Sequence, residues 1–504
     1  MGTARRNGRL ALLGEFCTFT SAHGFSDIYR SRNIWLLLWL LAWAATWAFC
    51  SWQSAKIMIG YYQYPVQTNN RIERMKDPRF PAVTICNLNP YKLTYLKRNH
   101  PNIVARINNM IDELKDEALT ATGPTGQKQV DKKKQIERWV RRQIFENKVD
   151  FERSGHRLED MLLECTYAEE DCDETMFVSW EHALYGTCHT FLANDTNVDY
   201  GPEFGLRLAL YTEHTEYIPV LSESVGFRVN VDSRQYVAFP ETSGFTVSPS
   251  SYTAIGVRQQ EIWRKGLPYE GTPCNAFKED DSFFTFWDLN FDDGQPGHQT
   301  NYSQLACIES CVNRIIYDSC ECLDPSKAKW NASKCTAMDR CPSACFEHKF
   351  YATLASSLWP SKEYFSAMFA RWVDRAPGLC DFVQGLHQND AELLCDKTPA
   401  QRKSILSGMK AKEKDKYGDS LEQTLLNATA SVRDTVAKLE VYYEELIHEI
   451  IIETPMYDPY SLLSNLGGTL GLFGGLSTLT LLQFVELFIR FVFYYEKEEE
   501  KNDH

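Results

Sequence analysis

The sequence predicts a membrane protein with two transmembrane α-helices and one large, disulfide-rich α+β domain between them. Residues 33–55 and residues 459–485 are runs of 23 and 27 residues without Asp, Glu, Lys or Arg, and about 20 apolar residues suffice to cross a bilayer. Fourteen of the 16 cysteines lie between the two runs. An even set of cysteines is typical of a domain that disulfides stiffen in an oxidising compartment.

The two runs divide the chain into five segments. The first run is too long, too rich in Trp and too far from residue 1 to be a signal peptide. We therefore expect a cytosolic N-terminus at 1–32, a first transmembrane helix at 33–55, an extracellular domain at 56–457, a second transmembrane helix at 458–493 and a cytosolic C-terminus at 494–504.

Glycosylation sequons and positive charges predict the orientation in the membrane. Four Asn-x-Ser/Thr sequons lie between the two runs, at Asn194, Asn301, Asn331 and Asn427, and sequons are modified on the outer side of the membrane. Five arginines precede the first run, which favours a cytosolic N-terminus. The sequence thus predicts a multi-pass glycoprotein of the plasma membrane with both termini in the cytosol.

The intervening domain carries both strand and helix patterns. Four stretches rich in alternating or β-branched residues predict strands: 80–87, 206–211, 227–231 and 439–443. Residues 136–144 and 307–316 repeat apolar side chains at helical spacing. The polar, Gly- and Lys-containing stretch 120–134 predicts a loop. We therefore expect a domain of mixed α and β structure.

Charge and motifs argue against several functions. The formal net charge of −14 offers no basic face for a nucleic acid. The spacings Cys320-x-Cys322 and Cys341-x3-Cys345 are compatible with zinc, but disulfides are the better interpretation in an oxidising compartment. Nucleophile-elbow, His-Glu-x-x-His and phosphate-loop motifs do not occur in the sequence. We expect no enzyme, no metal and no cofactor, and a two-pass receptor or adhesion protein without a pore is an alternative.

The second apolar run has the composition of a pore wall. Small and polar residues recur in it every three to four positions, at Ser464, Gly468, Gly471 or Leu472, and Gly475. Tight packing of small residues against another helix is the alternative explanation. Gly474-Gly475 weakens the helix at mid-membrane, where unwound backbone is tolerated only if it lines water or is buried in protein. Its carbonyls would suit a hard cation.

Polar and charged residues continue one face of this helix toward the C-terminus. Gln483, Glu486 and Arg490 follow at positions i, i+3 and i+7, and a Glu within a membrane helix marks an ion path by default. Two helices cannot enclose a pore, so we expect a closed ring of several chains. The sequence therefore predicts an ion channel subunit.

Several distinct sequence motifs are spread along nearly the whole chain. They are His23-Gly24, Tyr64-Pro65, the stretch 80–87, Gly155-His156 ahead of Met161 to Cys165, the cysteine-rich stretch 307–345, and residues 463–468 before Gly475-Leu476-Ser477. In these motifs the chain resembles the degenerin and epithelial sodium channel family. The resemblance implies a homotrimeric, amiloride-sensitive channel for Na+ with a hand-like extracellular domain of palm, β-ball, finger, thumb and knuckle.

The resemblance also implies roles for individual residues. Gly475-Leu476-Ser477 would be the selectivity filter, and Ser464 would lie at a constriction where bulky substitutions hold such channels open. His23-Gly24 would be the gating dipeptide of the lower pore. The remaining residues expected along the pore are Gly468, Gly471, Leu472 and Glu486.

Within the family the sequence looks most like the invertebrate FMRFamide-gated sodium channels. Val66-Gln67 follows Tyr64-Pro65 where acid-sensing members have histidine near this turn, and the finger segment is long and Lys-rich. We expect a short amidated neuropeptide as the ligand. Proton gating and constitutive or mechanical opening are the alternatives. The expected peptide-binding residues are Trp139, Phe145, Phe151, Asp171, Asp173 and Glu174, although the aromatic residues could equally be finger core.

The family order of cysteines implies five disulfides. They are Cys86–Cys188, Cys165–Cys172, Cys274–Cys345, Cys307–Cys341 and Cys322–Cys335. The four remaining cysteines depart from the family pattern. We expect them to pair as two short local loops, Cys311–Cys320 and Cys380–Cys395.

Overall fold

The computed structural model describes most of the chain, and all that follows concerns these residues: 12–76, 78–120, 126–147, 149–182, 184–193, 199–218, 221–269, 274–275, 302–320, 341–376, 379, 398, 401 and 432–500. The chain divides into two compact units. The helical unit comprises Met1–Asn69, Arg264–Cys274 and Ile452–His504, and the sheet unit comprises Asn70–Trp263 and Asn275–Ile451.

The helical unit contains the two apolar runs. α3 spans Ile34–Tyr62 and is long and apolar enough to cross a membrane. It continues seven residues beyond the expected end at 55, past Lys56, whose ammonium lies 5.5 Å from the centroid of the Trp52 ring. The helix ends ahead of Pro65, before which helical backbone is disfavoured.

The second apolar run, expected as one transmembrane helix weakened at Gly474-Gly475, forms two helices that are separated at residues 475–477. α16 spans Pro459–Gly474 and α17 spans Thr478–Glu500. Pro459–Gly474 and Thr478–Phe493 together are long and apolar enough to form one span, bent by 67° at the break. Asp458 caps α16, since its side chain accepts a hydrogen bond from the Ser461 N–H.

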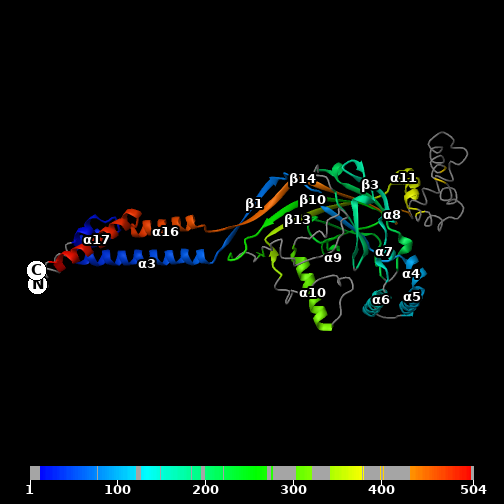
Figure 1. Cartoon of the computed structure of the whole chain (residues 1–504), viewed down its shortest axis with the longest axis horizontal. Helices are drawn as coiled ribbons and strands as arrows, with labels where there is room; N and C mark the ends of the chain where they lie inside the picture. Colours follow the sequence, from blue (N-terminus) through cyan, green and yellow to red (C-terminus); the bar gives the residue numbers. More distant parts are fainter. Residues whose placement is uncertain are drawn as a thin grey trace. The chain divides into compact units, whose positions relative to one another are not determined.

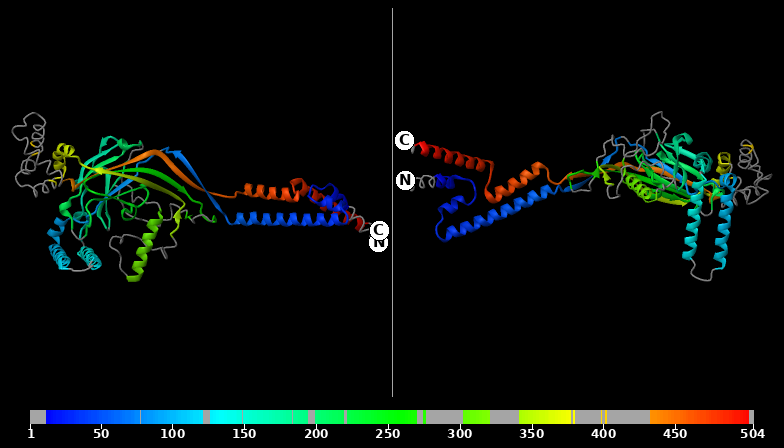
Figure 2. Two further views of the ribbon diagram at one scale, coloured as in Figure 1. Left: turned by 180° about the vertical axis from the view of Figure 1, so that it is seen from behind. Right: turned by 60° about the horizontal axis from the view of Figure 1, so that its bottom comes forward.

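α16 packs along α3 (Figures 1 and 2). The rings of Phe473 and Phe49 are 4.9 Å apart, and the Cys50 thiol lies 3.8 Å from the Thr469 carbonyl. Before α3, residues 12–19 are helical and α2 spans Phe25–Arg30. The N-terminal segment 12–24 therefore precedes a short helix and then the membrane-length helix.

The sheet unit is built on two antiparallel sheets. The larger has the order β13-β10-β14-β7-β3-β4, with β1 also pairing with β14, and the smaller has the order β5-β6-β2-β8-β9. The strands of the larger sheet are β1 Val66–Arg74, β3 Leu162–Tyr167, β4 Glu170–Asp171, β7 Leu206–Tyr211, β10 Ser251–Trp263, β13 Phe346–Leu358 and β14 Val436–Pro455. Those of the smaller sheet are β2 Ala82–Asn87, β5 Phe177–His182, β6 Gly186–Phe191, β8 Phe227–Asp232 and β9 Phe245–Val247.

One apolar core joins the two sheets. Phe80, Phe191, Phe227 and Tyr443 are almost completely buried in it. Each of the four stretches expected to be strands contributes to this core, because β-branched and aromatic residues pack well on a pleated surface. A two-stranded pair, β11 Cys274–Asn275 with β12 Ser343–Ala344, lies outside these sheets.

Helices of the sheet unit contribute to further cores beside the main one. The helices are α4 Leu93–Asn99, α5 Pro101–Thr120, α6 Gly126–Glu146, α7 Phe151–Ser154, α8 Leu158–Met161, α9 Pro240–Ser243, α10 Gln304–Cys320 and α11 Lys362–Arg375. α5 and α6 run side by side (Figure 2) around Ile107, Val140 and Ile144. The loop expected at 120–134 is wrong from residue 126 onward, where α6 has begun.

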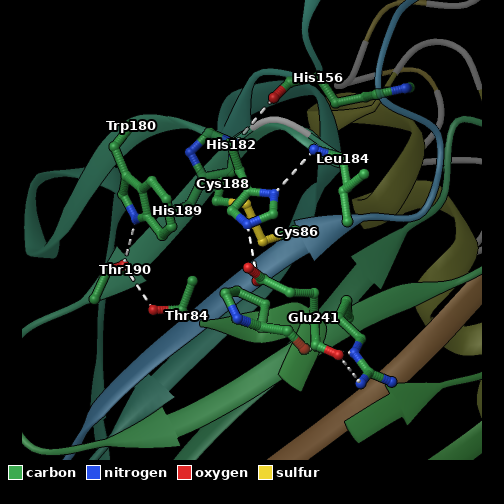
Figure 3. Close-up of a disulfide and its surroundings, with 12 residues drawn as sticks. Thr84, Cys86, His156, Trp180, His182, Leu184, Cys188, His189, Thr190 and Glu241 are labelled. Atoms are coloured by element: carbon green, nitrogen blue, oxygen red, sulfur yellow. Dashed lines mark hydrogen bonds and ion pairs between the residues drawn. A yellow bond between two sulfur atoms is a disulfide. The ribbon is translucent and has the colours of Figure 1, made fainter. Parts of the chain in front are cut away.

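Three of the expected disulfides are present. Cys86–Cys188 joins directly paired residues of β2 and β6 with a Cα–Cα distance of 4.3 Å (Figure 3). Cys165–Cys172 closes the β3–β4 hairpin, and Cys307–Cys341 ties α10 to the residues before β12. Cys274 and Cys345 are also disulfide-bonded.

The expected pair Cys311–Cys320 is wrong. Both residues belong to the continuous helix α10, nine positions apart. At about 1.5 Å per residue their Cα atoms are separated by roughly 13 Å, and a disulfide needs about 4.4–6.8 Å. The pairs Cys322–Cys335 and Cys380–Cys395 and the sequons at Asn194, Asn301, Asn331 and Asn427 lie outside the described residues.

Candidate functional site

The break between α16 and α17 is the most distinctive feature of the helical unit. Gly475 follows α16 with φ +67°, a left-handed conformation that suits glycine. A Cβ atom at this position would lie 2.6 Å from His23 Cδ2 and 2.7 Å from the Ser21 carbonyl oxygen. The break therefore needs glycine both for its backbone angle and for the close approach of the N-terminal segment.

The N-terminal segment folds back onto this break. The His23 N–H donates to the Gly474 carbonyl at 3.0 Å. Gly24 has φ +85°, and a Cβ atom there would lie 2.7 Å from Trp43 Cδ1 of α3. The dipeptide His23-Gly24 thus lies between α3 and the end of α16, and Figure 2 shows this segment beside the bend.

A buried hydroxyl satisfies the backbone that the break leaves unpaired. Thr480, in the first turn of α17, is fully buried. Its hydroxyl donates to the Gly475 carbonyl at 3.1 Å and accepts from the Ser477 N–H at 3.1 Å. Ser477 in turn caps α17, because its Oγ accepts the Thr480 N–H at 3.2 Å. Unwound backbone is stable in a membrane only with such partners.

Two polar side chains of α17 hold the N-terminal segment. The Ser21 hydroxyl hydrogen-bonds with that of Thr480, and the Ser21 N–H donates to Gln483 Oε1 at 3.1 Å. The Thr20 hydroxyl donates to the same oxygen at 3.2 Å. Thr480 and Gln483 are three residues apart and so project from one face of α17.

Aromatic and ionic contacts extend this docking along α17. Phe16 is buried, and its ring lies 5.0 Å from that of Phe484. Arg490 pairs with Glu486 at 2.5 Å and with Glu15 of the N-terminal segment at 3.6 Å. These three charged side chains are about half exposed, so each ion pair adds little to stability. Glu486, expected on the pore, is thus also an ion-pair partner.

The small and polar stripe of α16 faces away from α3. Ser464, Gly468 and Leu472 are exposed, and a Cβ atom built on Gly468 would meet nothing within 4 Å. Gly471 is half-buried near the Leu476 carbonyl, to which its Cβ would come within 3.8 Å. Leu476 is half-buried and Ser477 is exposed. The stripe is therefore open in the single chain and available to neighbouring copies or to water.

The residues expected to bind a peptide belong to different parts of the sheet unit. Trp139 is half-buried against the core of α4, α5 and α6, as expected if it is finger core. Asp171, Asp173 and Glu174 are exposed on and just after the β3–β4 hairpin, beside Cys172 of the main core. The side chains of Phe145 and Phe151 lie outside the described part of the chain.

Sequence reasoning missed three of the residues that assemble this site. Thr20, Ser21 and Thr480 were not singled out, although hydroxyl residues directly before His23-Gly24 and directly after a glycine break are a usable signal. Ser and Thr side chains are among the groups that re-satisfy freed backbone in membrane helices.

The comparison with known families decides the identity. The family model for the amiloride-sensitive sodium channel matches residues 16–487. The chain belongs to the amiloride-sensitive sodium channel family. Members of this family are membrane-bound ion channels and not enzymes, so the chain is a subunit of such a channel.

Relatives from several branches of the family are similar to the chain. The epithelial sodium channel subunit alpha of Xenopus laevis is 24% identical over 96% of this chain and 84% of the relative. Acid-sensing ion channel 1A of Danio rerio is 25% identical over 84% and 76%. The degenerin-like protein unc-105 of Caenorhabditis elegans is 27% identical over 67% of this chain and 35% of its own length. These similarities support the family and leave the opening stimulus to be proposed.

Proposed function

We propose that the chain is a subunit of a homotrimeric, Na+-selective, amiloride-blocked channel of the plasma membrane. α3 and the bent pair of α16 and α17 would be its two membrane passes, with residues 56–457 outside the cell and both termini in the cytosol. The observation that carries this proposal is the glycine break at Gly475, which interrupts an apolar helix pair whose small and polar stripe is open. A pore-free receptor would have no need of either feature.

The selectivity filter of this channel is Gly475-Leu476-Ser477. Gly475 permits the turn, and the exposed Ser477 keeps a short polar side chain beside the break. Three copies around a symmetry axis would form a narrow ring of such groups, which can replace part of the hydration shell of a small cation. Ser464, about three turns earlier on α16, is the constriction above it.

The gate includes His23-Gly24. The N–H of His23 holds the Gly474 carbonyl, so movement of the N-terminal segment would change the backbone at the break directly. Arg490 and Glu15 would add an ionic contact at the cytosolic end. Docking and release of the segment would thus be the two-state element that opens and closes the pore.

Voltage clamp of cells that express this chain alone tests the channel function. We expect a current that amiloride blocks and whose reversal potential follows external Na+. Replacing Ser477 with a larger residue should lower the preference for Na+ over K+. A current with equal permeability to both ions in the unaltered chain would refute the proposed function.

The opening stimulus that we favour is an extracellular short amidated neuropeptide. In the sheet unit, the larger sheet would be the palm, the smaller sheet the β-ball, α4 to α6 the finger, α10 the thumb and α11 the knuckle. The finger, with Trp139 on its helix pair, would take the aromatic side chains of the peptide. Asp171, Asp173 and Glu174 would meet its positive charges.

One group of residues favours proton gating as the second candidate. On three neighbouring strands of the larger sheet, Glu261 Oε1 lies 3.3 Å from His448 Nδ1 and 3.9 Å from His348 Nδ1. Burial lowers the pKa of His348 below its usual value, so this imidazole is neutral at physiological pH and gains charge only in acid. Current evoked by a pH step but not by amidated peptides would decide for this candidate.

A further inference from the structure

The hydroxyl of Thr480 contacts both the N-terminal segment and the backbone between α16 and α17. It lies within hydrogen-bond distance of the Gly475 carbonyl at 3.1 Å, the Ser477 N–H at 3.1 Å, the Ser477 hydroxyl at 3.0 Å and the Ser21 hydroxyl. The side chain is fully buried. Water therefore does not compete for these bonds. The neighbouring protein groups alone determine to which atom the Thr480 hydroxyl donates and from which atoms it accepts.

A count of donors and acceptors gives one arrangement that satisfies the backbone groups around Thr480. A threonine hydroxyl has one hydrogen and two lone pairs. The Ser477 N–H can only donate, so it takes one lone pair, and the Ser21 hydroxyl can donate into the other. The single hydrogen of Thr480 then goes to the Gly475 carbonyl, which can only accept. The two backbone groups and the Ser21 hydroxyl are satisfied in this arrangement, and it leaves no lone pair of Thr480 for the Ser477 hydroxyl.

We propose that Thr480 is a positioning residue for the filter, and that Ser21 sets its orientation. With Ser21 in place, the Thr480 hydroxyl holds the Gly475 carbonyl in one direction. If Ser21 withdraws, one lone pair of Thr480 becomes free, the Ser477 hydroxyl can donate into it, and the Thr480 hydroxyl turns relative to the Gly475 carbonyl. The cytosolic N-terminal segment would thus adjust the backbone that selects ions. This inference rests on the proposed filter at Gly475 to Ser477.

Gln483 holds the backbone of Ser21 at the position from which its hydroxyl reaches Thr480. Its Oε1 accepts the Ser21 N–H at 3.1 Å and the Thr20 hydroxyl at 3.2 Å, and lies 3.5 Å from the Ser21 hydroxyl. The backbone of Ser21 is therefore fixed one turn of α17 below Thr480. The Ser21 hydroxyl is directed to Thr480, since that contact is the shorter of its two.

Substitutions that remove or keep one hydroxyl test this inference. Thr480→Val removes the hydroxyl at nearly constant volume, and Thr480→Ser keeps it. Ser21→Ala and Ser21→Thr form the matching pair on the N-terminal segment. The measurement is the Na+ to K+ permeability ratio from reversal potentials, which does not depend on how many channels reach the surface.

We expect Thr480→Val and Ser21→Ala to lower the ratio by about two- to fivefold, the scale of one lost hydrogen bond, while Thr480→Ser and Ser21→Thr retain it. The double variant Thr480→Val with Ser21→Ala should match Thr480→Val alone, because Ser21 acts only through Thr480. A ratio unchanged in Thr480→Val, or effects of the two variants that add, would overturn the inference. If Thr480→Val carries no current, an unchanged ratio in Ser21→Ala overturns it instead.

Variants at Ser477 separate this inference from the proposed filter. If larger residues at Ser477 lower the ratio and the Thr480 and Ser21 variants do not, only the role of Thr480 fails. If the ratio is insensitive to Ser477 as well, the filter assignment itself fails.

Discussion

Replacing Gly475 with Ala should release the N-terminal segment from the break. The new Cβ atom would lie 2.6 Å from His23 Cδ2 and 2.7 Å from the Ser21 carbonyl oxygen. The left-handed backbone angle of +67° costs a residue with a side chain about 1–2 kcal/mol. Loss of the bond from the His23 N–H to Gly474 adds about 1 kcal/mol.

These terms sum to about 2–3 kcal/mol, which lowers the docked population of the segment relative to the released one roughly 30- to 150-fold. Disulfide trapping measures this directly. Cysteines introduced at Ser21 and Thr480, whose hydroxyls are in contact, should cross-link readily under mild oxidation of isolated membranes. Adding Gly475→Ala should reduce the rate of cross-linking by roughly the same 30- to 150-fold.

Gly467→Ala is the matched control for this experiment. A Cβ atom at Gly467 of α16 meets nothing within 4 Å, and alanine favours helix, so this variant should cross-link as the unaltered chain does. Equal cross-linking of the Gly475→Ala and Gly467→Ala variants would refute the inference that the break and the N-terminal segment are held together by close contact.

Three further predictions address the pore and the sheet unit. Ser464→Cys, modified by a cationic thiol reagent, should give sustained current without agonist, since a bulky charge at the constriction cannot be accommodated in the closed state; a modified but silent channel argues against that position. Larger residues at Ser477 should lower the Na+ over K+ preference, whereas unchanged reversal potentials across Li+, Na+ and K+ would place the filter elsewhere. Burial lowers the pKa of His189 from 6.5 to about 4, so between these values the unfolded chain binds the proton and the folded chain does not. This group should therefore reduce the free energy of unfolding as pH falls from 6.5 to 4, by about 3 kcal/mol in full. Thermal unfolding of the purified chain should show a shallower pH slope for His189→Gln, and an identical slope would contradict this.

Periodicity and composition were enough to predict the elements whose physics is local. The uncharged run that became α3, the strand patterns that became β2, β7, β8 and β14, and the weak helix at Gly474-Gly475 all follow from neighbouring residues. The wrong prediction of a loop also has a local cause. The stretch from residue 126 was expected to be a loop because it is polar, but Gln and Lys are good helix formers and α6 begins there.

Contacts between distant residues could not be predicted in this way. Ser21 and Thr480 are 459 positions apart, and nothing in either neighbourhood indicates the other. The pair Cys311–Cys320 was inferred from the cysteines left over, without allowing for a helix that continues through both. The peptide-binding set stays a prediction: Trp139 packs against the core of α4 to α6, and Asp171 lies on the β3–β4 hairpin.

The central claim is that the glycine break in the second apolar run selects Na+. The most direct measurement is the reversal potential of the amiloride-sensitive current through channels made of this chain alone, with Ser464→Cys modified so that no agonist is needed, as external Na+ is exchanged for K+. We expect a large negative shift in the otherwise unaltered channel and a smaller shift when Ser477 carries a larger residue. No shift in either channel would contradict the claim.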